Sequence, residues 1–335
     1  MGSNSEKTNR KSADERRISF IVWAPHSARA SSLSERLNAR LHLLHQKFRK
    51  KSYALFKYRT LSEQTKTILF EEKPEIVIAQ IPPIFCASSA LDYCKATNSR
   101  LVVDVHTGAF DKIWSIFRSK TLHVLRQSTL ALVTNNSLAE MLDSMQVRSL
   151  VLEDPISRIT TKSKTQLEDG TNVAVISSFS PDEPLSEILK TADKVSNVNF
   201  YITGDLKFAK KEYIKTKREN VVYTDFMDYD SYISLLNSVD AIVVLTKRED
   251  TLLSGGYEAL ALGKPLITSN TSVLVNYFSK GAIHVNNTSD EITKAIEKVT
   301  SDKIKLGKEM EELRSLKEKE WDTKFNDLKR ILDFV

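Results

Sequence analysis

The chain has 335 residues, of which 41% are hydrophobic and 27% charged, and its formal net charge is +6. This composition excludes a disordered or fibrous protein, and the length suffices for two domains that each bury a core. No apolar stretch approaches the ~20 residues of a membrane-spanning helix. Cys86 and Cys94 lie too far apart on a predicted helix for a disulfide, and no Cys/His cluster predicts zinc. We therefore expect a cytoplasmic protein.

Residues 1–16 are polar and are expected to form a disordered leader. A first domain is predicted over residues 17–156, where short apolar runs alternate with helical patterns. Apolar residues at helical spacing predict one amphipathic helix over residues 33–48. The predicted strands are residues 17–23, 53–58, 76–81, 101–105, 130–134 and 149–152.

Residues 157–170 are rich in Ser, Thr and Lys, which predicts a linker, and a second domain is predicted over residues 171–302. Residues 303–335 form a charged helical tail with one apolar side. Both series of strands alternate with helices, which predicts an α/β fold of two Rossmann-like, doubly wound domains facing a cleft. The second series comprises residues 172–177, 198–202, 221–223, 241–245, 265–268 and 282–285.

Residues 240–268 carry the clearest signal of a binding site. An apolar run and a polar loop lead to Gly255 and Gly256 at the start of a predicted helix, with Glu258 in its first turn. The first turn of a helix presents unpaired N–H groups and the positive end of the dipole, so it binds anions. Glycines there admit a diphosphate, and a glutamate can accept hydrogen bonds from ribose hydroxyls. The segment therefore predicts a nucleotide-sugar site.

This segment resembles the donor-binding segment of GT-B glycosyltransferases, in particular the retaining family 4 group. Asp250 stands where the family has Glu, and Thr251 where it has Gly. The resemblance implies a GT-B fold, sugar transfer from a nucleoside diphosphate donor with retention, and neither cofactor nor metal. It also implies that the tail packs back on the first domain. The family pattern E-G-x6-E-A-x-A-x-G-x-P-V-I is matched at Asp250, Glu258, Ala259, Ala261, Gly263, Pro265, Leu266 and Ile267.

The resemblance also implies which residues form the site. His106, at a strand end, would contact the transferred sugar or the acceptor, and Asp250 would orient sugar hydroxyls. Residues 177–183 lack the Arg or Lys that many relatives carry for the diphosphate, so Lys247 or Arg248 would supply that charge. The other expected donor-binding residues are Gly204, Phe226, Ser254, Gly255, Gly256, Tyr257 and Glu258.

Several alternatives stay open. The S-S-x-S-P-D-E run of residues 177–183 gives a more distant likeness to chitobiosyldiphosphodolichol mannosyltransferases, which would imply inversion. The same architecture would suit a nucleotide-sugar 2-epimerase, and the missing cation would suit a non-catalytic donor-binding subunit. Asp228 and Asp230 spell the metal-binding motif D-x-D, but they precede a predicted helix, so Asp228 is interpreted as its N-cap.

The first half of the chain is basic. Residues 1–160 hold 24 Lys and Arg against 15 Asp and Glu, a net +9, whereas residues 161–335 hold 25 against 28, a net −3. No acidic residue lies between Glu35 and Glu63. Such an imbalance predicts an anionic partner. We expect a glycan or lipid-linked acceptor and peripheral contact with an anionic membrane surface, but no nucleic acid. The cations expected to face the membrane are Arg36, Arg40, Lys47, Arg49, Lys50 and Lys51. They belong to a basic run that comprises Arg29, Arg36, Arg40, Lys47, Arg49, Lys50, Lys51, Lys57 and Arg59.

Overall fold

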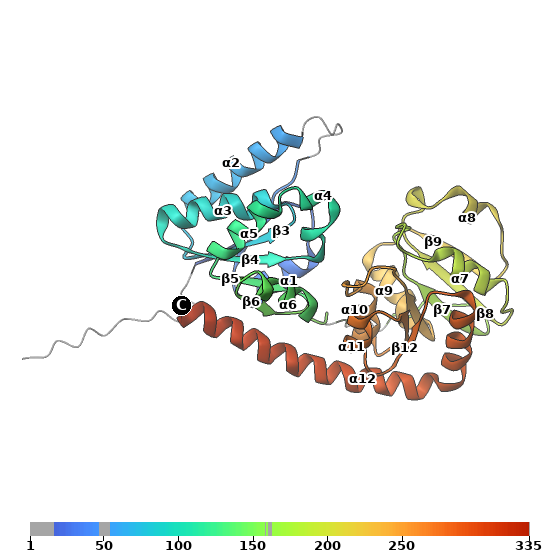
Figure 1. The fold of residues 1–335 in the computed structure, drawn as a ribbon. Coiled ribbons are helices and arrows are strands. Elements are labelled where there is room, and N and C mark those ends of the chain that lie inside the picture. The colour runs from blue at the N-terminus through green and yellow to red at the C-terminus, as the bar shows by residue number, and fades with distance from the viewer. Residues whose placement is uncertain (1–16, 47–53, 158, 160–162, 335) are drawn as a thin grey trace, which may run out of the picture. The chain divides into compact units, whose positions relative to one another are not determined.

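The structure is a computed structural model that describes residues 17–46, 54–157, 159 and 163–334 (Figure 1). The chain divides into two compact units, Met1–Pro155 with Trp321–Val335 and Ile156–Glu320. No helix among the described residues is both long and apolar enough to cross a membrane. The expected leader and the cations Lys47, Arg49, Lys50 and Lys51 lie outside the described residues.

The first unit is a six-stranded parallel sheet in the order β2-β1-β3-β4-β5-β6, with helices in the connections (Figure 1). The chain order is β1 (Ile18–Val22), α1 (Ala28–Arg36), β2 (Arg40–Leu43), α2 (Ala54–Glu72), β3 (Ile76–Ile81), α3 (Ile84–Thr97), β4 (Arg100–Val105), the 3-10 helix η3 (Thr107–Phe110), α4 (Lys112–Ser115), α5 (Arg118–Gln127), β5 (Leu130–Val133), α6 (Asn136–Ser144) and β6 (Ser149–Val151).

Both faces of this sheet are buried, because successive side chains of a strand point to opposite faces. In β3, Val77 and Ala79 face a core formed with α2, α3, α5 and α6. Ile76 and Ile78 face a second core, formed with α1 and the end of α12 (Ser289–Phe334). The tail of the chain is therefore part of the first unit, to which it contributes Trp321, Phe325, Leu328 and Leu332.

The segment after β1 differs from the sequence prediction. One amphipathic helix was predicted over residues 33–48, but α1 ends at Arg36 and β2 begins at Arg40. Asn38 adopts a positive φ of 50°, which is incompatible with a continuing helix. Leu41 reaches the core from a strand instead, so its helical spacing from Leu37 is coincidental.

The strand predicted at residues 53–58 is also wrong, because α2 occupies this region from Ala54 onward. The helix continues to Glu72, and its fully buried Leu61, Thr65 and Leu69 recur every four residues. This spacing places them on one helical face against the sheet. The short alternation of aromatic and basic residues at positions 56–59 imitates the two-residue period of a strand, which explains the wrong prediction.

The second unit is a parallel sheet in the order β12-β11-β10-β7-β8-β9 (Figure 1). The chain runs outward from β7 to β9, then crosses back to β10 and runs outward on the other side. This is the Rossmann order, in which ligands bind at the carboxyl ends of the two central strands, here β7 and β10. Its elements are β7 (Thr171–Val175), α7 (Leu185–Ala192), β8 (Val198–Thr203), the 3-10 helix η4 (Leu206–Phe208), α8 (Lys211–Lys215), β9 (Val221–Asp225), α9 (Tyr229–Ser238), β10 (Ala241–Val244), α10 (Ser254–Leu262), β11 (Leu266–Ser269), α11 (Ser272–Tyr277), β12 (Ala282–Val285) and the first part of α12.

The predicted fold class of two Rossmann-like α/β sheets is thus confirmed. Two glycines in the second unit allow α12 to pack closely on it. Gly263 ends α10 in the left-handed conformation, as predicted, with a φ of 65°. At Gly281, which also has a positive φ, an added Cβ would lie 2.6 Å from the carbonyl oxygen of Leu306 in α12. Neither turn tolerates a larger residue without strain.

Candidate functional site

Helix α10 follows β10 and therefore begins at the point where the strand order reverses. Its N-cap is Leu253, which gives no side-chain cap. The N–H groups of Gly256 and Tyr257 donate to the Leu253 carbonyl oxygen at 3.0 and 3.4 Å. Within the described residues, nothing accepts a hydrogen bond from the N–H groups of Ser254 or Gly255. These two donors, at the positive end of the helix dipole, remain available for an anion.

The two glycines of α10 are required by packing. An added Cβ at Gly255 would lie 2.7 Å from Cδ1 of Ile176, and one at Gly256 would lie 2.5 Å from Cζ of Phe278. Both missing side chains therefore face protein atoms. The sequence interpretation, in which the pair clears room for a diphosphate, is corrected at this point. The glycines bring the helix start close to Ile176 and Phe278, so their role is packing.

Glu258 is the fifth residue of α10 rather than a first-turn residue, because the helix begins one residue before the glycines. Its Oε2 accepts a hydrogen bond of 2.5 Å from the Tyr232 hydroxyl of α9. Burial raises the pKa of Glu258, and the hydrogen bond from Tyr232 offsets only part of this rise. A carboxylate has about four acceptor positions, so one tyrosine can orient Glu258 and leave capacity for sugar hydroxyls.

A polar network holds the loops after β7 and β10 together. Thr246 donates from Oγ1 to Oδ2 of Asp182 at 2.7 Å, and the Lys247 N–H donates to the Asp182 carbonyl oxygen at 2.9 Å. The Thr246 N–H also donates to Ser269, whose hydroxyl donates to Asn287. Burial raises the pKa of Asp182, but its hydrogen bonds lower it by more, which favours the carboxylate. The strand ends at the switch point are therefore fixed against one another.

Residues 177–183, which lack the Arg or Lys that many relatives carry there, are organised around an acid. Glu183 accepts hydrogen bonds from the hydroxyls of Ser177 and Ser178 and from the Ser178 N–H, at distances from 2.5 to 3.1 Å. Residues 177–183 are thus closed around a carboxylate. Positive charge for a diphosphate has to come from another segment.

The loop after β10 carries that charge. Lys247 and Arg248 are exposed there, as is Asp250. The Arg248 charge contributes to lowering the pKa of Asp182 across the switch point. The loop therefore places two cations close to the segment that lacks one.

The ends of β8 and β9 carry the two other predicted donor-binding residues. Gly204 has a φ of 119°, and an added Cβ would clash with the carbonyl oxygen of Ser177, so only glycine fits. Phe226 is 78% exposed. Asp225 accepts a hydrogen bond of 3.0 Å from the Leu206 N–H, which joins the loops that follow the two strands.

In the first unit, His106 follows β4 at the carboxyl edge of the sheet, with its side chain 36% exposed. Its Nε2 lies 3.2 Å from Oδ2 of Asp104 and 2.8 Å from Nε2 of Gln80. The buried Asp104 pairs through Oδ1 with Nε of Arg29 at 2.9 Å, and Arg29 also pairs with Asp154. His106 and Asp154 are thus the two partly exposed ends of a row of charges whose middle members, Arg29 and Asp104, are buried.

These contacts determine the charge of His106. Burial lowers its pKa, but the Asp104 carboxylate raises it by more, so the pKa lies above that of an ordinary histidine. Burial also raises the pKa of Asp104, but the charges of Arg29 and His106 lower it by more. Asp104 therefore stabilises the protonated form of His106 relative to an equally buried histidine that has no carboxylate beside it.

The D-x-D motif has a structural role. Asp228 is the N-cap of α9, and its Oδ1 accepts a hydrogen bond of 3.0 Å from the Ser231 N–H. This confirms the cap interpretation. Across the part of the chain that the structure describes, no three His, Cys, Asp or Glu side chains are grouped to hold a metal ion.

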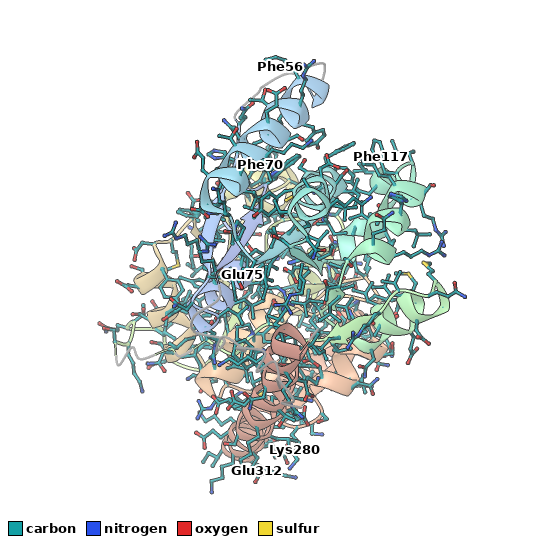
Figure 2. The ribbon with its side chains drawn as sticks, turned by 90° about the vertical axis from the view of Figure 1, so that its left-hand side faces the viewer. Phe56, Phe70, Glu75, Phe117, Lys280 and Glu312 are labelled. Atoms are coloured by element: carbon teal, nitrogen blue, oxygen red, sulfur yellow. The ribbon has the colours of Figure 1, made fainter. Side chains whose placement is uncertain are left out.

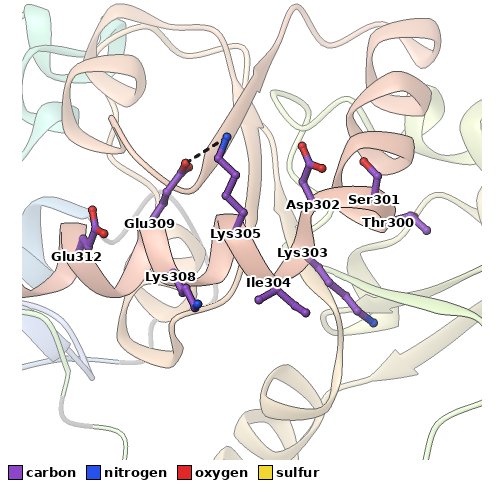
Figure 3. Close-up of a pocket in the computed structure, with 9 residues that line it drawn as sticks. All are labelled: Thr300, Ser301, Asp302, Lys303, Ile304, Lys305, Lys308, Glu309 and Glu312. Carbon is purple, nitrogen blue, oxygen red and sulfur yellow. Dashed lines mark ion pairs between the residues drawn. The ribbon is translucent and has the colours of Figure 1, made fainter.

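A hollow on α12 lies beside the amino-terminal edge of the second sheet, away from the switch point. Figure 3 shows its side chains splayed along the helix, with Lys305 paired to Glu309. Lys303 pairs with Asp240, which directly precedes β10, so the hollow adjoins the amino-terminal edge rather than the switch point. It is lined by Thr300, Ser301, Asp302, Lys303, Ile304, Lys305, Lys308, Glu309 and Glu312.

A comparison with protein families agrees with this geometry. Residues 157–318 match the family described as glycosyl transferases group 1. This group 1 match contains the loops at the switch point and all of α10. No curated protein matches the sequence.

Solved structures show how far the fold extends. Anabaena HepE in complex with UDP and glucose is 12% identical, with a TM-score of 0.72 over 96% of this chain and 100% of that one. A sucrose-phosphate synthase from Thermosynechococcus elongatus is 11% identical, with a TM-score of 0.76 over 95% and 99%. The lipopolysaccharide outer core galactosyltransferase WaaB in its apo form is 13% identical, with a TM-score of 0.60 over 93% and 98%. The chain, with its group 1 match, therefore has the GT-B fold over both units.

Several residues at the site escaped the sequence interpretation. Tyr232 lies 26 positions before Glu258, and Arg29 lies 75 before Asp104, so neither contact has a local signal. Asp104 did have one, because residues two apart on a strand share a face and it stands two before His106. Asp182 belongs to the S-S-x-S-P-D-E run, but nothing in the sequence predicted its contact with Thr246.

Proposed function

We propose that the protein is a glycosyltransferase that moves a sugar from a nucleoside diphosphate donor to a glycan or lipid-linked acceptor. The observation that carries the proposal is the group 1 match over a unit whose switch point presents α10. The first unit, with His106 at its carboxyl edge, holds the acceptor. Hexose is the expected transferred group.

The donor's diphosphate lies at the start of α10. The N–H groups of Ser254 and Gly255 donate to its oxygens, and Lys247 or Arg248 neutralises the remaining charge. Glu258 accepts hydrogen bonds from the ribose hydroxyls. That HepE was solved with UDP supports a uridine nucleotide as the first donor to test.

Transfer breaks the bond between the anomeric carbon and a β-phosphate oxygen and joins that carbon to an acceptor hydroxyl oxygen. Negative charge develops on the leaving diphosphate, which takes up the proton of that hydroxyl. Helix-start amides and a basic side chain stabilise that charge without reorganising. They act in place of a metal ion. Asp250 orients the hydroxyls of the transferred sugar, and His106 contacts that sugar or the acceptor.

Retention rests on the family 4 likeness of residues 240–268, in which Asp250 and Glu258 stand eight positions apart. Inversion, which the more distant likeness to mannosyltransferases implies, needs a general base that takes the acceptor proton.

The test is a transfer assay with a panel of nucleoside diphosphate sugars and acceptors, with and without EDTA. We expect acceptor-dependent release of the nucleoside diphosphate that survives EDTA, and a product with the donor's anomeric configuration. Donor binding without release would favour a non-catalytic subunit, and a donor changed at C2 would favour a 2-epimerase. Loss of activity with EDTA, restored by manganese, would contradict metal-independent transfer.

A further inference from the structure

One surface of the first unit, around α4, exposes apolar side chains to solvent. Ile113 in α4 and Ile116 directly after it are each 77% exposed. Trp114 and Phe117 turn the other way and pack against the main core of the unit. A helical turn in a water-soluble surface normally exposes polar residues opposite its buried face. Here, apolar side chains occupy both sides.

An aromatic cluster braces this surface. The ring centroid of Tyr58 in α2 lies 6.3 Å from that of Trp114 and 5.1 Å from that of Phe85 in α3. Phe85 in turn lies 4.9 Å from Phe117, beside the start of α5. Figure 2 shows Phe56, which is 59% exposed, at the beginning of α2. The two isoleucines therefore project from packed elements.

Cations lie on α2 and α5, the helices beside the aromatic cluster. Lys57 lies with Nζ 6.0 Å from the Tyr58 ring centroid, Lys120 lies with Nζ 5.0 Å from that of Phe85, and Arg118 is exposed. None of these three forms an ion pair with any residue that the structure describes. The sequence has no acidic residue from position 112 to 139. The surface therefore combines exposed apolar side chains with an excess of cations over its one adjoining acid, Asp111 at the N-cap of α4.

Other described cations of the basic run have structural roles. Arg29 is buried in ion pairs with two aspartates. Arg36 lies over the Trp321 ring, 4.4 Å from its centroid, and Arg40 pairs with Glu72. These described members of the basic run hold the first unit together.

We infer that the surface of Ile113, Ile116, Lys57, Arg118 and Lys120 attaches the protein to a membrane that contains anionic lipids. The isoleucines enter the boundary between head groups and acyl chains, and the cations meet lipid phosphates. A projecting aliphatic pair suits an acyl layer better than nucleic acid, which proteins contact through polar, basic and aromatic side chains.

The attachment also orients the first unit. The 3-10 helix η3 and α4 directly follow β4, so the isoleucines lie at the same edge of the sheet as His106. If the proposed function holds, a lipid-linked acceptor meets that edge at the membrane surface. Membrane binding itself needs neither donor nor turnover, so its test is independent of sugar transfer.

The experiment is flotation of the full chain with phosphatidylcholine vesicles, with or without phosphatidylglycerol, at about 0.1 M and about 1 M salt. Wild type should float only with anionic vesicles at the lower salt. Ile113→Ser/Ile116→Ser should weaken partitioning at least about tenfold, and Arg118→Ser/Lys120→Ser roughly fivefold per cation. Ile304→Ser is the matched control, because Ile304 is 74% exposed between two lysines in the second unit. Circular dichroism and melting curves confirm that each variant is folded.

A second readout follows the inserted position directly. An environment-sensitive fluorophore on Ile113→Cys should shift to the blue with anionic vesicles, and the same label on Ile304→Cys should not. Cys86 and Cys94 are buried, so the introduced thiol reacts first. Equal flotation of wild type and the isoleucine variant, or an unshifted label at position 113, would overturn the inference. Loss of binding in the cation variant alone would point to a purely electrostatic partner and would also overturn it.

Discussion

At the scale of single residues, the charge of His106 depends on one buried neighbour. Burial disfavours the imidazolium, and the Asp104 carboxylate, which Arg29 keeps ionised, reverses that preference. Asp154 also pairs with Arg29, but it raises the pKa of His106 only through the electrostatic effect of its charge at a distance. Substituting each aspartate in turn therefore separates the effect of direct contact on the pKa of His106 from the effect of a more distant charge.

Asp104→Asn should lower the pKa of His106 below that of an ordinary histidine, because burial then acts without the opposing carboxylate. Histidine-resolved NMR across a pH titration measures the change. Asp154→Asn is the control and should lower the pKa much less. An unchanged pKa in a folded Asp104→Asn variant would show that the network does not determine the charge of His106. Arg29→Met/Asp104→Asn relieves the unpaired arginine if the single variant is unstable.

At the scale of elements, the start of α10 is fixed by two missing side chains. Phe278 is fully buried and touches Tyr257 and Tyr277, so its ring has no room to move away from a Cβ at position 256. The sequence suggested a ligand-driven reason for these glycines, whereas the structure gives a packing reason.

Gly256→Ala should destabilise the second unit by about 1–3 kcal/mol, the cost of overpacking a core. Gly307→Ala is the matched helical control. Its Cβ would meet only the Gly263 carbonyl oxygen at 3.4 Å, so the better helix propensity of alanine should leave stability equal or higher. Denaturant unfolding of both variants measures the difference. Equal midpoints for wild type and Gly256→Ala would contradict the packing reason.

The sequence predicted most strands because their apolar runs are buried on both faces, as Ile76–Ile81 in β3 illustrates. It failed between β1 and β3, where leucines at helical spacing belong partly to α1 and partly to β2. The position of α10 and the cap at Asp228 followed from local rules. The partners of Glu258 and His106 did not, since tertiary contacts between distant residues leave no periodic trace.

At the scale of the whole molecule, α12 belongs to both units. Its first part packs on the second sheet through residues such as Ile292 and Val299, and its last part completes a core of the first unit. The end of the chain therefore stabilises the unit that contains its beginning.

Removal of residues 321–335 should destabilise the first unit and leave the second folded. Each of the four large apolar side chains lost contributes about 1.5–3 kcal/mol through burial. Scanning calorimetry should show one transition lowered and the other unchanged. Leu316→Ser is the control, because Leu316 is 46% exposed on the same helix and its loss should change neither transition. Two unchanged transitions after truncation would contradict this role of the tail.

We propose that the switch point of the second unit binds a nucleoside diphosphate, with Glu258 on the ribose. Calorimetric titration of wild type with UDP and other nucleoside diphosphates, beside Glu258→Ala and Tyr232→Phe, tests it most directly. We expect Glu258→Ala to lose about 1.5–3 kcal/mol of binding, roughly 10- to 100-fold in Kd. Tyr232→Phe should bind nearly as well as wild type, because it keeps the carboxylate. No binding of any nucleoside diphosphate to wild type, or equal affinity in a folded Glu258→Ala variant, would contradict the claim.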